Sequence, residues 1–154
     1  MRIRLPAIFL VLAAAATTLW TAEEALLGTW KLNLAKSQVG GPAPKSRIMK
    51  IEPSGSGIKV TVDEIDAQGK PNSRAYTANF DGKDVGNPIA PDRDTISWKR
   101  IDARTWETTS KQAGKITATS KRVLSPDGKV FTLTTTSRNA QGPPTVAVMV
   151  YEKQ

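Results

Sequence analysis

The 154-residue sequence contains no cysteine and no histidine, and these two absences exclude most of the common enzyme mechanisms. Without them the chain cannot form a Ser-His-Asp triad, a Cys-His pair or an ordinary zinc site. Histidine is also the usual general acid or base near neutral pH. The lack of cysteine means that no disulfide stabilises the fold, so a single apolar core must do so. We therefore expect a non-catalytic protein without a metal ion or a cofactor.

Two kinds of segment that could suggest a ligand-binding loop are better explained as turns. Gly-Lys recurs four times, but no pair is followed by the Ser or Thr of a phosphate-binding loop. The acidic segment 81–94 lacks the regular ligand spacing and closing Glu of a calcium loop. Composition leaves one catalytic alternative open, an enzyme that works through carboxylates, tyrosine or lysine.

Residues 1–22 have the features of a secretory signal peptide. A short basic start, Met1–Arg4, precedes a dozen apolar residues, Leu5–Ala16, and small residues offer a cleavage site after Ala16 or alternatively after Ala22. The apolar run is short for a membrane span, although retention of the leader as an anchor stays open. We expect an exported protein, periplasmic or extracellular, with one domain at 27–153.

The composition is basic, with 22 Lys and Arg against 14 Asp and Glu. Loss of Arg2 and Arg4 with the leader leaves 20 basic residues, and the net charge falls from +8 to +6. These charges are interspersed rather than blocked, which favours a solvated surface and argues against specific nucleic-acid binding. A weak contact with anionic polymers or lipids of the cell envelope stays open, and a monomer is favoured.

The remaining sequence predicts strands joined by short turns. In the first strand, 27–34, Trp30, Leu32 and Leu34 share one face. Further strands are expected at 46–52, 58–66, 72–80, 95–101, 105–111, 116–123, 130–137 and 145–153. Segments 35–45 and 81–93 are rich in Gly and Pro and are expected to be irregular. No segment after the leader has a helical period.

The spacing of the turns indicates how the strands are connected. Apart from one interval of 20 residues, successive turn centres are 12 to 14 residues apart, at Gly57, Gly69, Gly82, Asp102, Gly114, Gly128 and Gly142. Long strands with short hairpins favour an up-and-down barrel over a sandwich. We predict an all-β antiparallel barrel of about eight to ten strands, in which the last strand lies beside the first and Trp30 closes one end.

Five residues are the candidates for lining a ligand site: Trp98, Arg100, Trp106, Arg122 and Tyr151. If the apolar side of each strand faces inward, both arginines lie at or near the interior, where each needs an anion from the protein or from a ligand. The alternative is that both lie at the rim with their charges in water. For Trp30 and Trp106, packing is favoured over a role as a platform for the ligand.

The inward face of the last strand stays open, because its apolar run is nearly continuous. Either Val146, Val148 and Val150 or their neighbours Ala147, Met149 and Tyr151 face the interior.

The first and last strands, Gly28–Leu32 and Val150–Lys153, resemble those of the lipocalin and fatty-acid-binding-protein (calycin) superfamily. More closely, GTWKLNLAKS, GPAPKS, DGKD, GNP, KRID, SPDGK and YEKQ together resemble small exported bacterial proteins described as lipocalin-like. The helix-turn-helix lid of fatty-acid-binding proteins has no counterpart in 35–45. Of their carboxylate-binding Arg-x-Tyr only Tyr151 is present, because Met149 stands at the arginine position.

The resemblance implies a lipocalin-like barrel that binds a small lipophilic or amphipathic ligand inside. The alternative is an interaction protein with a filled barrel, whose basic surface contacts anionic envelope polymers or lipids. Cavity volume would favour the first, and one-sided clustering of lysines the second.

Overall fold

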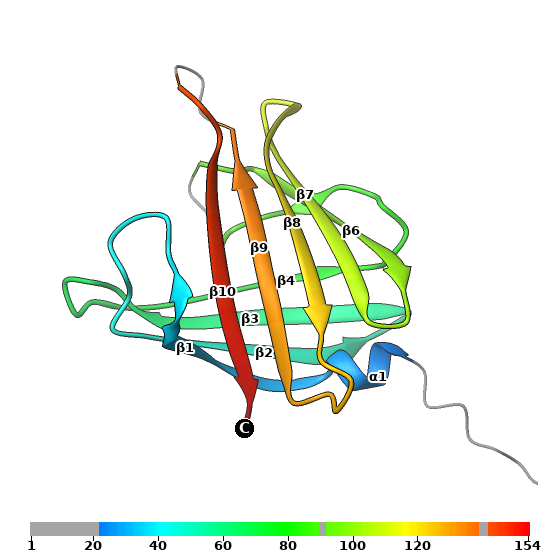
Figure 1. The fold of residues 1–154 in the computed structure, drawn as a ribbon. Coiled ribbons are helices and arrows are strands. Elements are labelled where there is room, and N and C mark those ends of the chain that lie inside the picture. Colours follow the sequence, from blue (N-terminus) through cyan, green and yellow to red (C-terminus); the bar gives the residue numbers. More distant parts are fainter. Residues whose placement is uncertain (1–21, 90–91, 139–141) are drawn as a thin grey trace, which may run out of the picture.

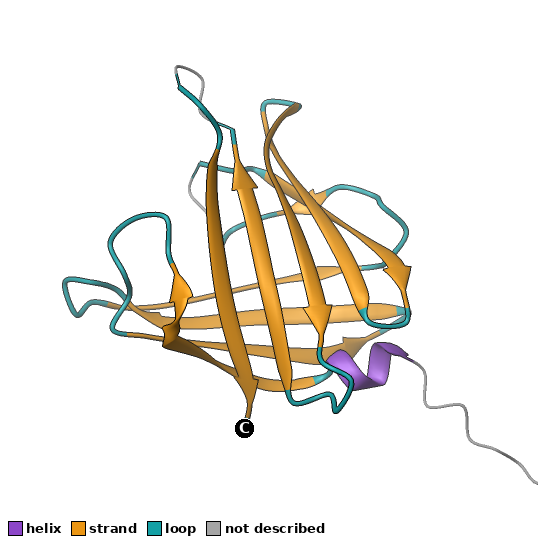
Figure 2. Ribbon diagram, viewed as in Figure 1, coloured by secondary structure: helices purple, strands orange, loops and turns teal. Residues whose placement is uncertain are grey.

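The computed structural model describes residues 22–89, 92–138 and 142–154, which form one ten-stranded antiparallel sheet curled into a barrel (Figure 1). A short helix, α1 (Ala22–Leu26), precedes the sheet and is the only helix in these residues (Figure 2). The strands are β1 (Gly28–Gln38), β2 (Ser46–Ser54), β3 (Gly57–Ile65), β4 (Pro71–Ala78), β5 (Val85–Gly86), β6 (Thr95–Asp102), β7 (Thr105–Gln112), β8 (Lys115–Leu124), β9 (Val130–Ser137) and β10 (Thr145–Lys153). Apart from Ala22, the predicted leader lies outside the described residues.

The strand order is that of an up-and-down barrel. Every strand except β4 and β5 pairs with both of its neighbours in sequence, and β10 pairs with β1, which gives the order β4-β3-β2-β1-β10-β9-β8-β7-β6-β5. In Figure 1, β2, β3 and β4 run across the view while β8, β9 and β10 run up it, so the two halves of the sheet cross steeply. The predicted all-β barrel, with its last strand beside its first, is confirmed.

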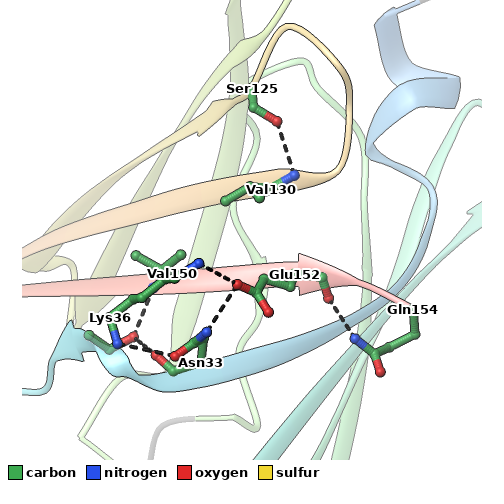
Figure 3. Close-up of polar contacts among 8 residues, drawn as sticks. Asn33, Lys36, Ser125, Val130, Val150, Glu152 and Gln154 are labelled. Carbon is green, nitrogen blue, oxygen red and sulfur yellow. Dashed lines mark hydrogen bonds and ion pairs between the residues drawn. The ribbon is translucent and has the colours of Figure 1, made fainter.

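The seam between β1 and β10 contains a bulge that the sequence did not indicate. The register runs from Trp30 opposite Lys153 to Asn33 opposite Val150, and then shifts. At the shift, Glu152 accepts hydrogen bonds from Asn33 Nδ2 at 3.0 Å and Lys36 Nζ at 2.9 Å (Figure 3). Leu34 lies beside the shift and is 38% exposed, whereas Trp30 and Leu32, the residues predicted to share its face, are buried.

One end of the barrel is filled by aromatic side chains beneath β1. Trp30 is fully buried and donates from Nε1 to the Leu26 carbonyl of α1 at 2.9 Å. Its ring makes an edge contact with Phe131, and Phe131 stacks on Tyr151, with 4.7 Å between ring centroids in each pair. The prediction that Trp30 closes one end is confirmed. The helix that supplies its acceptor was not predicted, because five residues are too few to show a period.

The sheet does not close by hydrogen bonds between β4 and β5. Side chains bridge this opening instead: Trp98 Nε1 donates to the Tyr76 hydroxyl at 3.0 Å, and Arg74 Nη1 donates to the Ile89 carbonyl at 2.8 Å. Strand β5 lies in the segment expected to be irregular and has only two residues, too few for alternation to reveal.

Candidate functional site

The open end of the barrel leads into a cavity of about 530 Å³. This volume lies in the range of small-molecule sites. Side chains from β2, β3, β4 and β6 to β10 line it, together with the 39–44 connection after β1. In β10 the lining residues are Thr145, Ala147, Met149 and Tyr151, whereas Val146 is 58% exposed. This observation settles the face of the last strand that the sequence left open.

The cavity has walls of different chemistry. Met49, Val60 and Val62 make the β2–β3 wall apolar. The opposite wall, on β7 to β9, carries hydroxyl groups from Thr108, Ser110, Ser120, Thr135 and Ser137. Ser120 and Thr135 are hydrogen-bonded to each other at 2.9 Å across β8 and β9. A molecule with an apolar side and an oxygen-bearing side matches these walls.

Arg122 is the most unusual side chain in the cavity. Its place in β8 turns it inward, and it is only 5% exposed. The guanidinium carbon lies 4.1 Å from the centroid of the Trp98 ring, and Nη1 donates to Thr108 Oγ1 at 3.3 Å. Nε is buried without a hydrogen-bond partner, and within the described ranges no carboxylate pairs with this arginine.

The environment of Arg122 makes its charge costly. Burial lowers the pKa of Arg122, and the nearby phenols of Tyr76 and Tyr151 oppose this shift. Arginine nevertheless stays protonated in proteins. A buried cation without a counterion is destabilising unless an anion approaches it. The inner part of the cavity is therefore suited to a negatively charged group.

Two buried tyrosines accompany this arginine. Burial raises the pKa of Tyr76, against the effect of Arg122, so its phenol is neutral at ordinary pH. Burial likewise raises the pKa of Tyr151, against the effect of Arg47 and Arg122. The Tyr76 oxygen accepts from Trp98, which leaves its own proton available for an oxygen acceptor in the cavity.

A second lining arginine, Arg47 of β2, differs because it already has its counterion. It forms an ion pair with Glu64 of the neighbouring strand β3. Its Nη1 also donates to Met149 Sδ at 3.3 Å, and the Tyr151 hydroxyl approaches the same sulfur at 3.9 Å. Of these two arginines, therefore, Arg122 is the one without a carboxylate counterion.

The five residues singled out from the sequence lie in different places. Arg122 and Tyr151 line the cavity, and Trp98 is fully buried behind the Arg122 guanidinium. Trp106 is also fully buried but does not line the cavity, and its Nε1 makes no hydrogen bond within the described chain. Arg100 is exposed and donates from Nε to the Asp102 carbonyl at 3.1 Å.

The expectation that Arg100 faces the interior is therefore wrong. Arg100 is still in register opposite Trp106, but it lies near the end of β6, beyond the residues that line the cavity, and its side chain reaches solvent there. The opposite alternative, that both arginines reach water from strand ends, is wrong for Arg122, which lies between inward neighbours on β8.

Several lining residues were missed from the sequence. Alternation along β4 places Asn72, Arg74 and Tyr76 on one face, and that pattern would have found them. Thr108 and Ser110 alternate in the same way on β7, but inward hydroxyl groups resemble the outward face of an ordinary strand. Arg93 precedes β6 in a loop, where no period places a side chain.

No family model matches this sequence, and no curated protein matches it. Several solved structures, however, match its fold. A mutant of the fluorescent protein UnaG has a TM-score of 0.57 at 17% identity, over 84% of this chain and 96% of that one. The Schistosoma mansoni fatty acid binding protein in complex with arachidonic acid has a TM-score of 0.58 at 12% identity, over 86% and 98%.

A third similar structure is the zebrafish ileal bile acid-binding protein complexed with cholic acid, with a TM-score of 0.51 at 14% identity, over 84% of this chain and 99% of that one. The fold is that of a calycin-type barrel. At such low identities the similarity establishes the fold and not the ligand.

Two absences concern only the part of the chain that the structure describes. There the calycin-type barrel has no helix that is long and apolar enough to cross a membrane. Nor do three or more acidic side chains come together there as candidate metal ligands. Acidic residues of the 81–94 segment make other contacts: Asp81 accepts the backbone N–H of Lys83 at 3.0 Å, and Asp84 forms an ion pair with Lys111 of β7 at 2.7 Å.

Proposed function

We propose that this barrel binds a small amphipathic molecule inside its cavity and holds an anionic group of that molecule against Arg122. The buried guanidinium without a carboxylate partner carries the proposal. A ligand anion would replace the missing counterion, and the Thr108 hydroxyl and the Tyr76 phenol line the same cavity. The apolar wall would take the hydrocarbon part of the ligand. That two proteins of similar fold were solved with arachidonic acid and cholic acid supports the ligand class.

The cavity favours ligand binding over the filled-barrel alternative. Side chains that filled the interior would leave no space of about 530 Å³. A catalytic role has little support, because Glu64, the carboxylate best placed in the cavity, forms an ion pair with Arg47. We propose a non-catalytic binding protein.

Native mass spectrometry of the protein purified from its own host tests this function. We expect a co-purifying acidic lipophile that is lost in Arg122→Gln. Arg138→Gln is the matched control, since Arg138 is exposed and the substitution changes the net charge equally. Added fatty acid should bind the control as it binds the wild type, and bind Arg122→Gln at least about tenfold more weakly. An unliganded mass, with no shift on adding a fatty-acid and isoprenoid panel, would contradict the proposal.

We further propose that the protein is exported and acts as a monomer, on the basis of its leader and its interspersed charges. Cell fractionation of the full chain, with and without residues 1–22, checks export. If the chains with and without residues 1–22 are recovered in the same fraction, the proposal that the leader directs export is contradicted.

A further inference from the structure

The cavity contains more positive charge than one anionic group would neutralise. Four arginines and two acidic residues line it, which gives a net charge of +2. Glu64 pairs with Arg47, and Asp66 accepts the backbone N–H of Lys70 at 2.8 Å in the β3–β4 turn. The remaining cations are Arg122 inside the barrel and two arginines nearer its mouth, Arg74 and Arg93.

Arg93 is poorly neutralised by the protein. Its Nη2 donates to Ser137 Oγ at 3.2 Å, a neutral acceptor. Its Nε lies 3.5 Å from the carboxylate of Asp92, which is 65% exposed, and this buried nitrogen makes no hydrogen bond among the described residues. The exposed carboxylate is screened by water and compensates little of the charge.

Arg74, on β4, likewise contacts neutral oxygens. Its Nε donates to Asn72 Oδ1 at 3.1 Å, and its Nη1 donates to the Ile89 carbonyl at 2.8 Å. In the ranges that the structure describes, no carboxylate pairs with it. The mouth therefore carries two guanidinium groups with only one weak carboxylate contact.

Strand register gives the separation between the inner and outer charges. The Arg122 guanidinium contacts Thr108, which lies level with Ser120 and Thr135 across β7 to β9. Arg93 contacts Ser137, two residues further along β9. Two residues correspond to about 7 Å along a strand, and the two strand spacings from β7 to β9 add about 10 Å across the sheet, so the charges lie roughly 12 Å apart. Apolar side chains line the cavity near both charges: Leu133 is two residues deeper on β9 than Thr135, and Ile96 of β6 lies level with Ser137. The two cations therefore lie at different depths of a partly apolar cavity.

We propose that the ligand is a dianionic amphiphile, with one acidic group at Arg122 and a second, roughly 12 Å away, at Arg93 near the mouth. This inference rests on the proposed function and specifies its ligand class. The inner group would be held by a desolvated cation, so it supplies most of the affinity. The outer group would contact Arg93, whose side chain is 21% exposed. This contact would make a dianion bind more tightly than a monoanion, but it would not be required for binding.

The test compares two probes of equal chain length, dodecanoate and dodecanedioate, by isothermal titration calorimetry on the delipidated protein. We expect the wild type to bind the dicarboxylate about tenfold more tightly than the monocarboxylate. Arg93→Gln should abolish this preference, so that the two probes bind it with about equal affinity, and Arg93→Lys should keep the preference. Arg122→Gln should weaken both probes. Arg138→Gln, an exposed charge outside the cavity, should behave as the wild type.

The outcomes separate this inference from the function on which it rests. If dodecanoate binds and dodecanedioate binds no more tightly, the second anchor is wrong while the carrier function stands. If the preference survives Arg93→Gln, Arg93 is not the outer anchor and the inference is also overturned. If neither probe binds the wild type, both the proposed function and the inference are contradicted.

Discussion

At the scale of single residues, the role proposed for Arg122 in binding implies a cost to folding, because its charge is buried without a carboxylate. Replacing it with Met keeps a long side chain against Trp98 and removes a buried cation without a counterion. We expect Arg122→Met to raise the free energy of unfolding of the delipidated protein by about 1–3 kcal/mol, because the desolvation cost disappears. The same substitution should abolish ligand binding. Urea unfolding, with Arg122→Lys as the control that keeps the charge, measures this difference, and destabilisation by Met would contradict it.

Two buried tryptophans offer a matched comparison. Trp30 donates its indole N–H to the Leu26 carbonyl, whereas Trp106 Nε1 has no partner among the described residues. Tryptophan to phenylalanine removes the same atoms at either position. At Trp30 it breaks a buried hydrogen bond, and at Trp106 it removes an unsatisfied donor. We expect Trp30→Phe to destabilise the protein by about 1–2 kcal/mol more than Trp106→Phe in thermal unfolding. Equal losses would show that the hydrogen bond contributes nothing.

At the scale of elements, alternation predicted the long strands because each has one buried face. Trp30, Leu32 and the inner residues of β3 follow the period of two. It failed at Leu34, beside the bulge after Asn33, and at Arg100, which follows the period but lies at a strand end outside the cavity. Alternation also could not show which face of β10 points inward, because both faces are apolar. It does not apply to Arg93, which lies in a loop. These residues are positioned by contacts with strands distant in sequence, which one sequence does not reveal.

The seam between β1 and β10 should depend on pH through Glu152. Hydrogen bonds from Lys36 and Asn33 lower the pKa of Glu152 below its ordinary value. Because the pKa of Glu152 is lower in the folded than in the unfolded protein, its charge stabilises the fold at pH values above the unfolded-state pKa. This contribution is lost as the pH falls through the folded-state pKa. We expect the difference in urea midpoint between wild type and Glu152→Gln to be larger near pH 7 than near pH 2. A difference independent of pH would mean that the seam does not use the charge.

At the scale of the whole molecule, the opening between β4 and β5 and the inner end of the cavity share residues. Tyr76 lines the cavity and accepts the Trp98 indole N–H across the opening. The same Trp98 ring lies against the Arg122 guanidinium. A ligand anion that orders Arg122 therefore also acts on the side chains that bridge the only unpaired edges of the sheet in the described chain.

This coupling predicts where the backbone should open and where a ligand should protect it. Strand β4 is paired on one side only and β5 has two residues, so their amides should exchange fastest among the strands, and those of β1, β2, β9 and β10 slowest. Adding dodecanoate should slow exchange in β4 and β5 more than in β2. Hydrogen–deuterium exchange followed by mass spectrometry measures both effects, with Tyr76→Phe as the variant in which the bridge is weakened. Uniform protection of all strands on binding would mean that the ligand stabilises the barrel without acting through this opening.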